Sequence, residues 1–244
     1  MKKRSSLTWV LIVLAIALGG AAFWLRAQPA TDPVVEGFKV VEVASVADAI
    51  EQLYGVKNYM YQDVRPLFRT KFAGRAVTVS LTKYENKEGA APTAPLVEAI
   101  DTAPAGSVYV MAVEDGVRYG VIGGLMGTTL KVRGAAGAVV DGSCRDLPQL
   151  NRLQFPVYCR GVAPGTTQGH HRATRNVPVT CAGVKINPGD IVTADEDGVV
   201  VVPREHEADI LKKAQALDYT EHATYPFIEQ TKSLGEAIKK FGRL

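Results

Sequence analysis

The chain has 244 residues, of which 47% are hydrophobic and 22% charged, a composition typical of a globular protein with one sizeable core. The net charge of +3 arises at the N-terminus, because the remainder balances 24 basic residues (28 minus Lys2, Lys3, Arg4 and Arg26) against 25 acidic ones. The balance predicts no polyanion-binding surface, so nucleic acid is not expected as a direct ligand.

The N-terminal segment is the most apolar part of the chain. Residues 7–25 carry no charge, and about 19 residues at roughly 1.5 Å each would cross the hydrocarbon core of a bilayer. With basic residues before it, this pattern predicts an N-terminal transmembrane helix in residues 1–26, and a domain outside the cytoplasm, periplasmic or extracellular. A cleaved signal peptide and a buried helix are the alternatives.

A linker is expected over residues 27–37, which hold two prolines and few large apolar side chains. Residues 38–244 then alternate between helical and strand patterns without an internal repeat, which predicts one α/β domain. Ser45 is the expected N-cap of a first helix that ends before Gly55. Later helices are expected over residues 95–102, 125–133 and from 205 onward. Strands are expected over residues 74–82, 107–113, 138–140, 156–160, 177–181 and 199–203, and those at 138–140 and 199–203 are expected to be buried.

Two glycines, Gly123 and Gly124, precede the helix that starts at Leu125. The first N–H groups of a helix lack intrahelical partners, so such an end can receive a carboxylate or a phosphate. A purely structural turn explains the glycines equally well. The segment is no phosphate-binding P-loop, because no Gly-Lys-Ser or Gly-Lys-Thr follows.

Arg145 and Asp146 follow a buried strand and the turn Asp141-Gly142, about 20 residues beyond the glycine pair. As neighbours on a surface they would form a weak ion pair. In a site, Arg145 would grip a substrate carboxylate and Asp146 would supply an oxygen ligand to Mg²⁺ or Mn²⁺.

Together these elements resemble the RraA-like family, which includes 4-hydroxy-4-methyl-2-oxoglutarate aldolases. The resemblance covers residues 123–146, from Gly-Gly-Leu-Met-Gly-Thr to Cys-Arg-Asp, and continues in residues 188–190 and 195–203. The resemblance implies a single compact domain similar to the phosphohistidine swivelling β/β/α fold, assembled as a homotrimer or homohexamer with sites between subunits. It implies a divalent-metal-dependent lyase that cleaves 4-hydroxy-2-oxo acids to pyruvate and also decarboxylates oxaloacetate. The alternative is a non-catalytic regulator that binds a protein partner such as a ribonuclease.

The resemblance also implies the roles of individual residues. Asp146 is the metal ligand and Arg145 binds the 2-keto acid substrate. The turn formed by Gly123, Gly124, Leu125 and Met126 would wrap the substrate, and Glu221 would assist proton transfer in the site of a neighbouring subunit. One departure is Gly124, which stands where many aldolase members carry an acid.

Histidines and cysteines give weaker signals. His170 and His171 are adjacent in an expected loop, where two neighbouring side chains rarely reach one ion. Cys144, Cys159 and Cys181 fit no metal-ligand spacing. One disulfide with one free thiol is possible for them, and three buried thiols are favoured.

Overall fold

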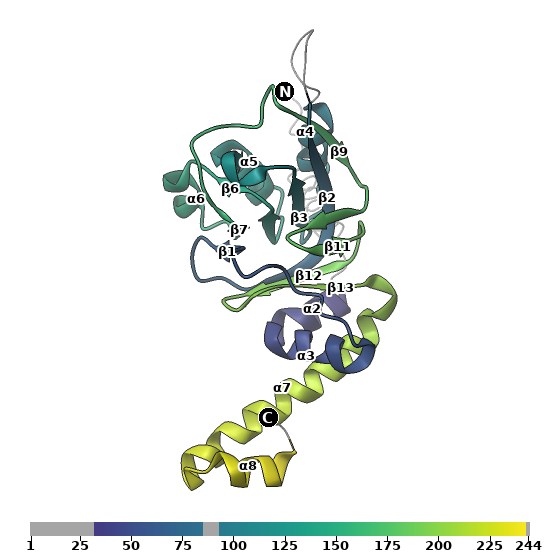
Figure 1. Cartoon of the computed structure of the whole chain (residues 1–244), viewed down its shortest axis with the longest axis vertical. Helices are drawn as coiled ribbons and strands as arrows, with labels where there is room; N and C mark the ends of the chain where they lie inside the picture. The colour runs from purple at the N-terminus through teal and green to yellow at the C-terminus, as the bar shows by residue number, and fades with distance from the viewer. Residues whose placement is uncertain (1–31, 85–92, 243–244) are drawn as a thin grey trace, which may run out of the picture. The chain divides into compact units, whose positions relative to one another are not determined.

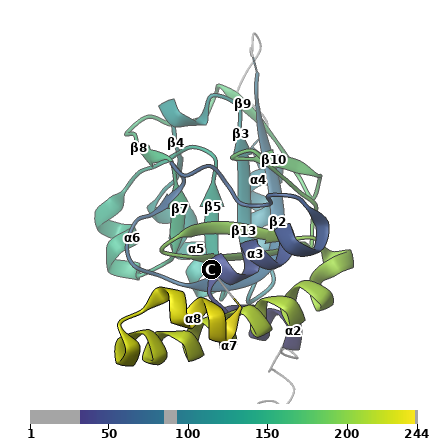
Figure 2. The ribbon, with the colours of Figure 1, turned by 60° about the horizontal axis from the view of Figure 1, so that its bottom comes forward.

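An eight-stranded sheet organises residues 32–84 and 93–242, the part of the chain that the computed structural model describes. The four central strands β7, β5, β3 and β2 run parallel and side by side (Figure 2), and their neighbours pair antiparallel. Carboxyl ends of parallel strands meet at one edge of a sheet. The strands are β1 (Arg65–Pro66), β2 (Phe72–Lys83), β3 (Val108–Val113), β5 (Gly137–Val140), β7 (Val157–Cys159), β9 (His171–Arg175), β12 (Ile191–Asp195) and β13 (Gly198–Val202).

Two smaller sheets and seven α-helices complete the described part. One small sheet is parallel, with strands β4 (Gly120–Ile122), β6 (Ser143–Cys144) and β8 (Gly161–Val162), and the other is the hairpin of β10 (Val179–Cys181) and β11 (Val184–Ile186). The helices are α2 (Pro33–Val40), α3 (Val43–Tyr54), α4 (Ala94–Asp101), α5 (Gly124–Val132), α6 (Leu147–Leu153), α7 (Glu207–Thr231) and α8 (Leu234–Phe241), with 3₁₀ turns η1 (Gly116–Arg118) and η2 (Arg204–His206).

The buried side chains form three clusters. The first lies between the parallel strands and helices α4, α5 and α6, and includes Ile100, Leu130 and Leu150. The second lies under the β10–β11 hairpin. The third packs α2, α3 and α7 against β12 and β13, so that α3 contacts both β13 and α7 (Figure 1). Each large apolar side chain so buried contributes about 2 kcal/mol.

The predicted elements are largely confirmed. All six residues of β3 are buried, as a central strand requires, and β2 contains the whole predicted stretch 74–82. Gly55 ends α3 with a φ of 68°, and Gly134 lies just beyond α5 with a φ of 79°. These left-handed conformations are the ones in which glycine commonly ends a helix.

Asp190, at the end of the family-like segment 188–190, has a specific structural role. Its side chain is 3% exposed, and its two carboxylate oxygens accept the backbone N–H groups of Asn187, over 2.7 Å, and of Arg204, over 3.1 Å. The carboxylate therefore closes the turn before β12 and joins it to the segment that leads into α7.

The start of the first long helix differs from the prediction. Helix α3 begins at Val43, and Ser45 is buried within its first turn without a partner for its hydroxyl group. Carboxylates from distant segments act as the cap instead: Asp218 accepts the N–H of Glu42 over 2.9 Å and Asp195 accepts that of Val43 over 3.0 Å.

The predicted linker is also too long. Residues 33–37 belong to α2, whose Val35 and Phe38 are buried in the third cluster. Pro33 is the first residue of this helix, a position that proline favours because its missing N–H would be unpaired there in any case.

The membrane-anchored fold requires a correction. Within residues 32–84 and 93–242, no helix is both long and apolar enough to cross a membrane. The 25-residue α7 carries charged side chains along its length, which are costly inside a bilayer. The predicted anchor of residues 1–26 lies outside the described residues. The transmembrane element of the fold class is corrected on this finding, together with the membrane partner and the location outside the cytoplasm that depended on it.

Candidate functional site

The glycine turn has the geometry of an open helix N-terminus. Gly123 directly follows β4 and is the N-cap residue of α5, where its carbonyl accepts the N–H of Gly127 over 2.9 Å. The N–H groups of Gly124, Leu125 and Met126 precede this first helical bond, so none of them has an intrahelical partner. Gly124 donates to the carboxylate of Asp146, which leaves Leu125 and Met126 as the two open donors of the turn.

Arg145 and Asp146 lie beside that turn because their strands pair. Strand β6 runs parallel to β4, and the N–H of Arg145 donates to the carbonyl of Ile122 over 2.9 Å. Asp146 adopts a left-handed conformation with a φ of 56° and is the N-cap residue of α6. Its Oδ2 accepts the N–H of Gly124 over 2.9 Å and lies 3.8 Å from Nε of Arg145.

The close approach of these segments leaves no room for a side chain at position 123 unless Asp146 and Arg145 shift. A Cβ there would lie 2.6 Å from Oδ2 of Asp146 and 3.0 Å from Cγ of Arg145, both too close for an ordinary contact. At Gly124 a Cβ would meet the Cγ of Gln149 at 3.0 Å, a flexible side chain that can shift. The glycine pair therefore lets Asp146 reach the first turn of α5.

A cavity of about 410 Å³ opens at this junction. The lining includes Gly123, Leu125, Met126, Arg145 and Asp146 from the predicted site, but not Gly124, whose N–H is turned to Asp146. The lining also includes two parts that the sequence analysis missed. One is an apolar wall from α4, formed by Leu96, Val97 and Ile100, and the other is the polar segment of residues 166–168. The sequence predicted a helix over residues 95–102, and nothing in its pattern showed that a cavity adjoins one of its faces.

The charges at the cavity suit an anionic ligand with a bound cation. Arg145 and Asp146 have side chains that are 41% and 49% exposed, so both are accessible from solvent. One carboxylate oxygen of Asp146 accepts the N–H of Gly124, and the second oxygen is available as a ligand for a cation. In the described residues, no set of three clustered acidic, His or Cys side chains includes Asp146. A cation there would depend on water and substrate oxygens for its other ligands, as Mg²⁺ often does.

Glu221 does not join this cavity within one chain. It lies on α7, which packs against α2, α3 and α8, and its carboxylate accepts the hydroxyl of Tyr225 over 2.7 Å. The residues that line the cavity come from α4, α5 and the neighbouring loops. Its reach into the site of a second subunit stays a prediction.

The two adjacent histidines point into different surroundings. His171 is 2% exposed, and its Nε2 lies 2.8 Å from the carbonyl of Glu114, whereas His170 is exposed. The three cysteines are free and buried, with Sγ of Cys144 and Cys159 3.3 Å apart.

The α/β sheet, with a glycine turn beside an Arg-Asp pair, is an arrangement that can be compared with known proteins, and the comparison identifies the family. Residues 43–201 match the family described as RraA-like, Aldolase/RraA. A protein of Halalkalibacterium halodurans named "Putative 4-hydroxy-4-methyl-2-oxoglutarate aldolase" is 30% identical over 179 residues, which cover 73% of this chain and 80% of that protein.

Solved structures agree. Streptomyces coelicolor RraAS2, described as an unusual member of the RNase ES inhibitor RraA protein family, is 26% identical with a TM-score of 0.71 over 82% of this chain and 98% of its own. An uncharacterised Pseudomonas syringae protein is 26% identical with a TM-score of 0.78 over 87% and 96%. The chain belongs to the RraA-like family.

Proposed function

We propose that this protein is a divalent-metal-dependent lyase that cleaves 4-hydroxy-2-oxo acids, such as 4-hydroxy-4-methyl-2-oxoglutarate, to pyruvate and also decarboxylates oxaloacetate. The observation that carries the proposal is the shared cavity, where Arg145, the open end of α5 and the Asp146 carboxylate meet. The name of the Halalkalibacterium halodurans relative supports the aldolase reaction.

The substrate carboxylate binds at the positive side of the cavity. The N–H groups of Leu125 and Met126 lie at the N-terminus of α5, where the helix dipole adds partial positive charge. The guanidinium of Arg145 provides a planar pair of donors that matches a carboxylate. These groups hold the 2-keto acid by its carboxylate and direct its keto oxygen towards Asp146.

The residues present fit a divalent cation that is held by one carboxylate oxygen of Asp146. The other oxygen accepts the N–H of Gly124, and this hydrogen bond fixes the carboxylate in place. When bound, Mg²⁺ or Mn²⁺ supplies Lewis-acid stabilisation of the negative charge that develops on the keto oxygen. The cavity lining in the described residues includes no lysine, so a Schiff-base mechanism has no candidate amine there.

Aldol cleavage also requires a base that removes the proton of the 4-hydroxyl group. Glu221 fills this role in the proposal, from α7 of a neighbouring subunit in a homotrimer or homohexamer. Decarboxylation of oxaloacetate needs no such proton removal. The two reactions therefore separate the contribution of Glu221 from that of Arg145 and Asp146.

The test measures pyruvate release by the full chain from oxaloacetate and from 4-hydroxy-4-methyl-2-oxoglutarate, with Mg²⁺ or Mn²⁺ and after EDTA. Asp146→Ala and Arg145→Ala are each expected to lower kcat/KM at least 100-fold on both substrates, since Asp146 would hold the cation and Arg145 would bind the substrate carboxylate. Glu221→Gln is expected to slow aldol cleavage alone.

Lys131→Ala is the matched control, because Lys131 is exposed at the far end of α5 and is expected to be dispensable. Wild-type rates in both the Asp146→Ala and Arg145→Ala proteins would exclude this site as the catalytic one. EDTA-resistant turnover would exclude the metal requirement.

A second candidate is a regulator that binds a protein such as a ribonuclease, which the likeness to Streptomyces coelicolor RraAS2 supports. A protein of this kind would release no pyruvate above the metal-only background, so the same assay distinguishes the two functions.

A further inference from the structure

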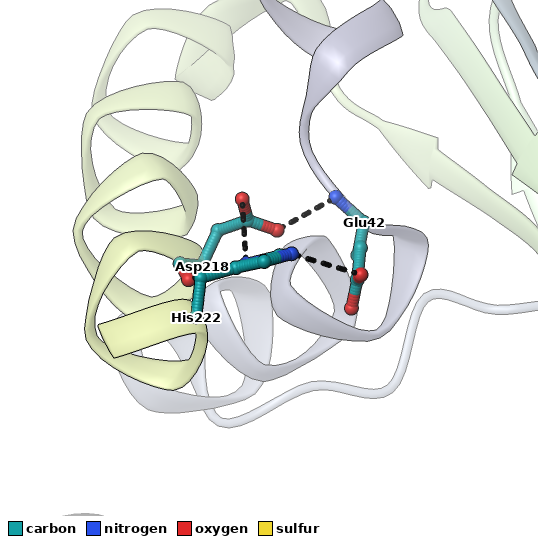
Figure 3. A group of neighbouring side chains, drawn as sticks. All are labelled: Glu42, Asp218 and His222. Carbon is teal, nitrogen blue, oxygen red and sulfur yellow. Dashed lines mark hydrogen bonds and ion pairs between the residues drawn. The ribbon is translucent and has the colours of Figure 1, made fainter. Parts of the chain in front are cut away.

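Three potential metal ligands converge where the start of α3 meets α7, away from the Arg145–Asp146 cavity. Glu42 is the N-cap residue of α3, and Asp218 and His222 lie one turn apart on the same face of α7. Figure 3 shows the three side chains directed towards one another, with His222 between the two carboxylates. One ligand atom from each residue lies within 4.8 Å of the other two.

The orientation of the His222 ring is fixed. Its Nδ1 lies 2.9 Å from the backbone carbonyl of Asp218, which can only accept a hydrogen bond, so Nδ1 carries the proton. In the neutral ring Nε2 then presents a lone pair. A ligating histidine in proteins is commonly oriented by this kind of hydrogen bond from its other ring nitrogen.

The atom that Nε2 faces is also an acceptor. Oε1 of Glu42 lies 3.4 Å away, which is long for a hydrogen bond. Two ligands that are each about 2.1 Å from a tetrahedral zinc ion are about 3.4 Å apart, so a shared cation fits this separation. In the neutral ring, the lone pairs of Nε2 and Oε1 repel one another unless a positive charge, either a proton on Nε2 or a bound cation, lies between them.

The surroundings are negative and already ordered. Oδ1 of Asp218 accepts the N–H of Glu42 over 2.9 Å, so this carboxylate is positioned by the fold, while its Oδ2 lies 3.6 Å from Nδ1 of His222. The hydrogen bond to the Asp218 carbonyl, with the charges of Asp218, Glu42 and Glu221, raises the pKa of His222. Lys71 is the basic residue that lines the same surface depression as Glu42, Asp218 and His222.

We propose that Glu42, Asp218 and His222 form a second metal site, which binds a zinc-like divalent cation and fastens the start of α3 to α7. Nε2 of His222 and one oxygen from each carboxylate are the ligands, and water completes the coordination. A mixed nitrogen and oxygen set favours Zn²⁺ over Mg²⁺, because imidazole suits zinc whereas magnesium prefers oxygen alone. The proposal does not rest on the proposed lyase activity, since none of its three residues lines the cavity of the same chain.

The experiment is a calorimetric titration of the metal-free full chain with Zn²⁺ alone. We expect one site whose Kd rises at least tenfold in His222→Gln, in Glu42→Gln and in Asp218→Asn. The last variant removes the charge of Asp218 but keeps an oxygen for the N–H of Glu42, so the cap of α3 survives. His170→Gln, at an exposed loop histidine, and Asp146→Ala are expected to bind Zn²⁺ at this site like the wild type.

Thermal unfolding provides a second readout. Zn²⁺ at a hundredfold excess over Kd should raise the Tm of the wild type by about 5 °C and leave that of His222→Gln unchanged. Tetrahedral Co²⁺ bands in the wild type that disappear in His222→Gln would support the same ligand. Equal Zn²⁺ affinity in the wild type and His222→Gln would overturn the proposal, and so would no binding to the wild type or binding lost only in Asp146→Ala.

Discussion

The carboxylate of Asp146 accepts the N–H of Gly124 over 2.9 Å and thereby joins the first turn of α5 to the start of α6. The hydrogen bond satisfies one of the unpaired donors at this helix end and leaves two others open to the cavity. It also fixes the direction of Asp146, whose second oxygen remains available to a cation. The site therefore depends on the closeness of two segments that the paired strands β4 and β6 bring together.

Gly123→Ala is predicted to disable the site without disturbing the backbone. A φ of −146° at this position is open to any residue, but the added Cβ would lie 2.6 Å from Oδ2 of Asp146. Because the carboxylate must move, and a displacement of about 1 Å in an active site can cost about 100-fold, we expect kcat/KM for pyruvate release to fall by about that factor.

The control for this change is Gly235→Ala in α8, where the nearest atom, Oγ of Ser233, lies at 4.0 Å. It is expected to retain wild-type activity, and both variants are expected to retain cooperative thermal unfolding. Full activity in Gly123→Ala would show that Asp146 can leave its position without consequence for the chemistry.

Gly124→Glu is predicted to shift the reaction towards aldol cleavage. The substitution places an acid where the resemblance to the aldolases leads one to expect an acid, and the new Cβ meets only side-chain atoms, with the Cγ of Gln149 nearest at 3.0 Å. Because a positioned acid-base group contributes up to about 10²–10⁴-fold in rate, we expect the ratio of aldol cleavage to oxaloacetate decarboxylation to rise at least tenfold.

Gly124→Gln separates charge from size in this experiment. It adds a side chain of the same length without a carboxylate, so its ratio of the two rates should stay near that of the wild type. A similar rise in both variants would attribute the effect to the shape of the turn and not to an added acid.

The sequence predicted the elements of the site because their signals are local. Gly134 ends α5 at the expected place, and the buried strand β5 leads into the turn at Asp141 as its apolar residues indicated. The hydrogen bond between Gly124 and Asp146 could not be predicted in this way. It depends on the parallel pairing of β4 and β6, strands of three and two residues that are too short to show a periodic pattern.

The start of α3 was missed for a related reason. The prediction looked for a cap within the local sequence and chose Ser45, whereas the actual acceptors, Asp195 and Asp218, lie 152 and 176 residues beyond the N–H groups that they bind. Local capping preferences describe an N-cap side chain that accepts an N–H two or three residues further along the chain. Here two acidic side chains from packed segments replaced the cap, and the choice among distant acids requires the tertiary structure.

Asp190→Ala is predicted to destabilise the fold without altering the site. The substitution leaves the N–H groups of Asn187 and Arg204 without their acceptor in a turn where the aspartate side chain is 3% exposed. Each buried donor that loses its partner costs about 1–3 kcal/mol, so we expect the free energy of unfolding to fall by about 3 kcal/mol in a denaturant titration. Asp197→Ala, at an exposed aspartate, should change it by less than about 0.5 kcal/mol, and equal stabilities of the two variants would contradict the role of Asp190.

The cysteines are predicted to be three free thiols that react only after unfolding. All three are buried, and burial raises the pKa of Cys181, which disfavours the reactive thiolate. Sγ of Cys144 and Cys159 lie 3.3 Å apart, so they are the pair that would form a disulfide if one were present. Protein purified without reductant should show no rapid thiol reaction when native and three thiols per chain when unfolded, and two in the unfolded Cys159→Ser protein. One thiol in the unfolded wild type, restored to three by a reductant, would demonstrate the disulfide instead.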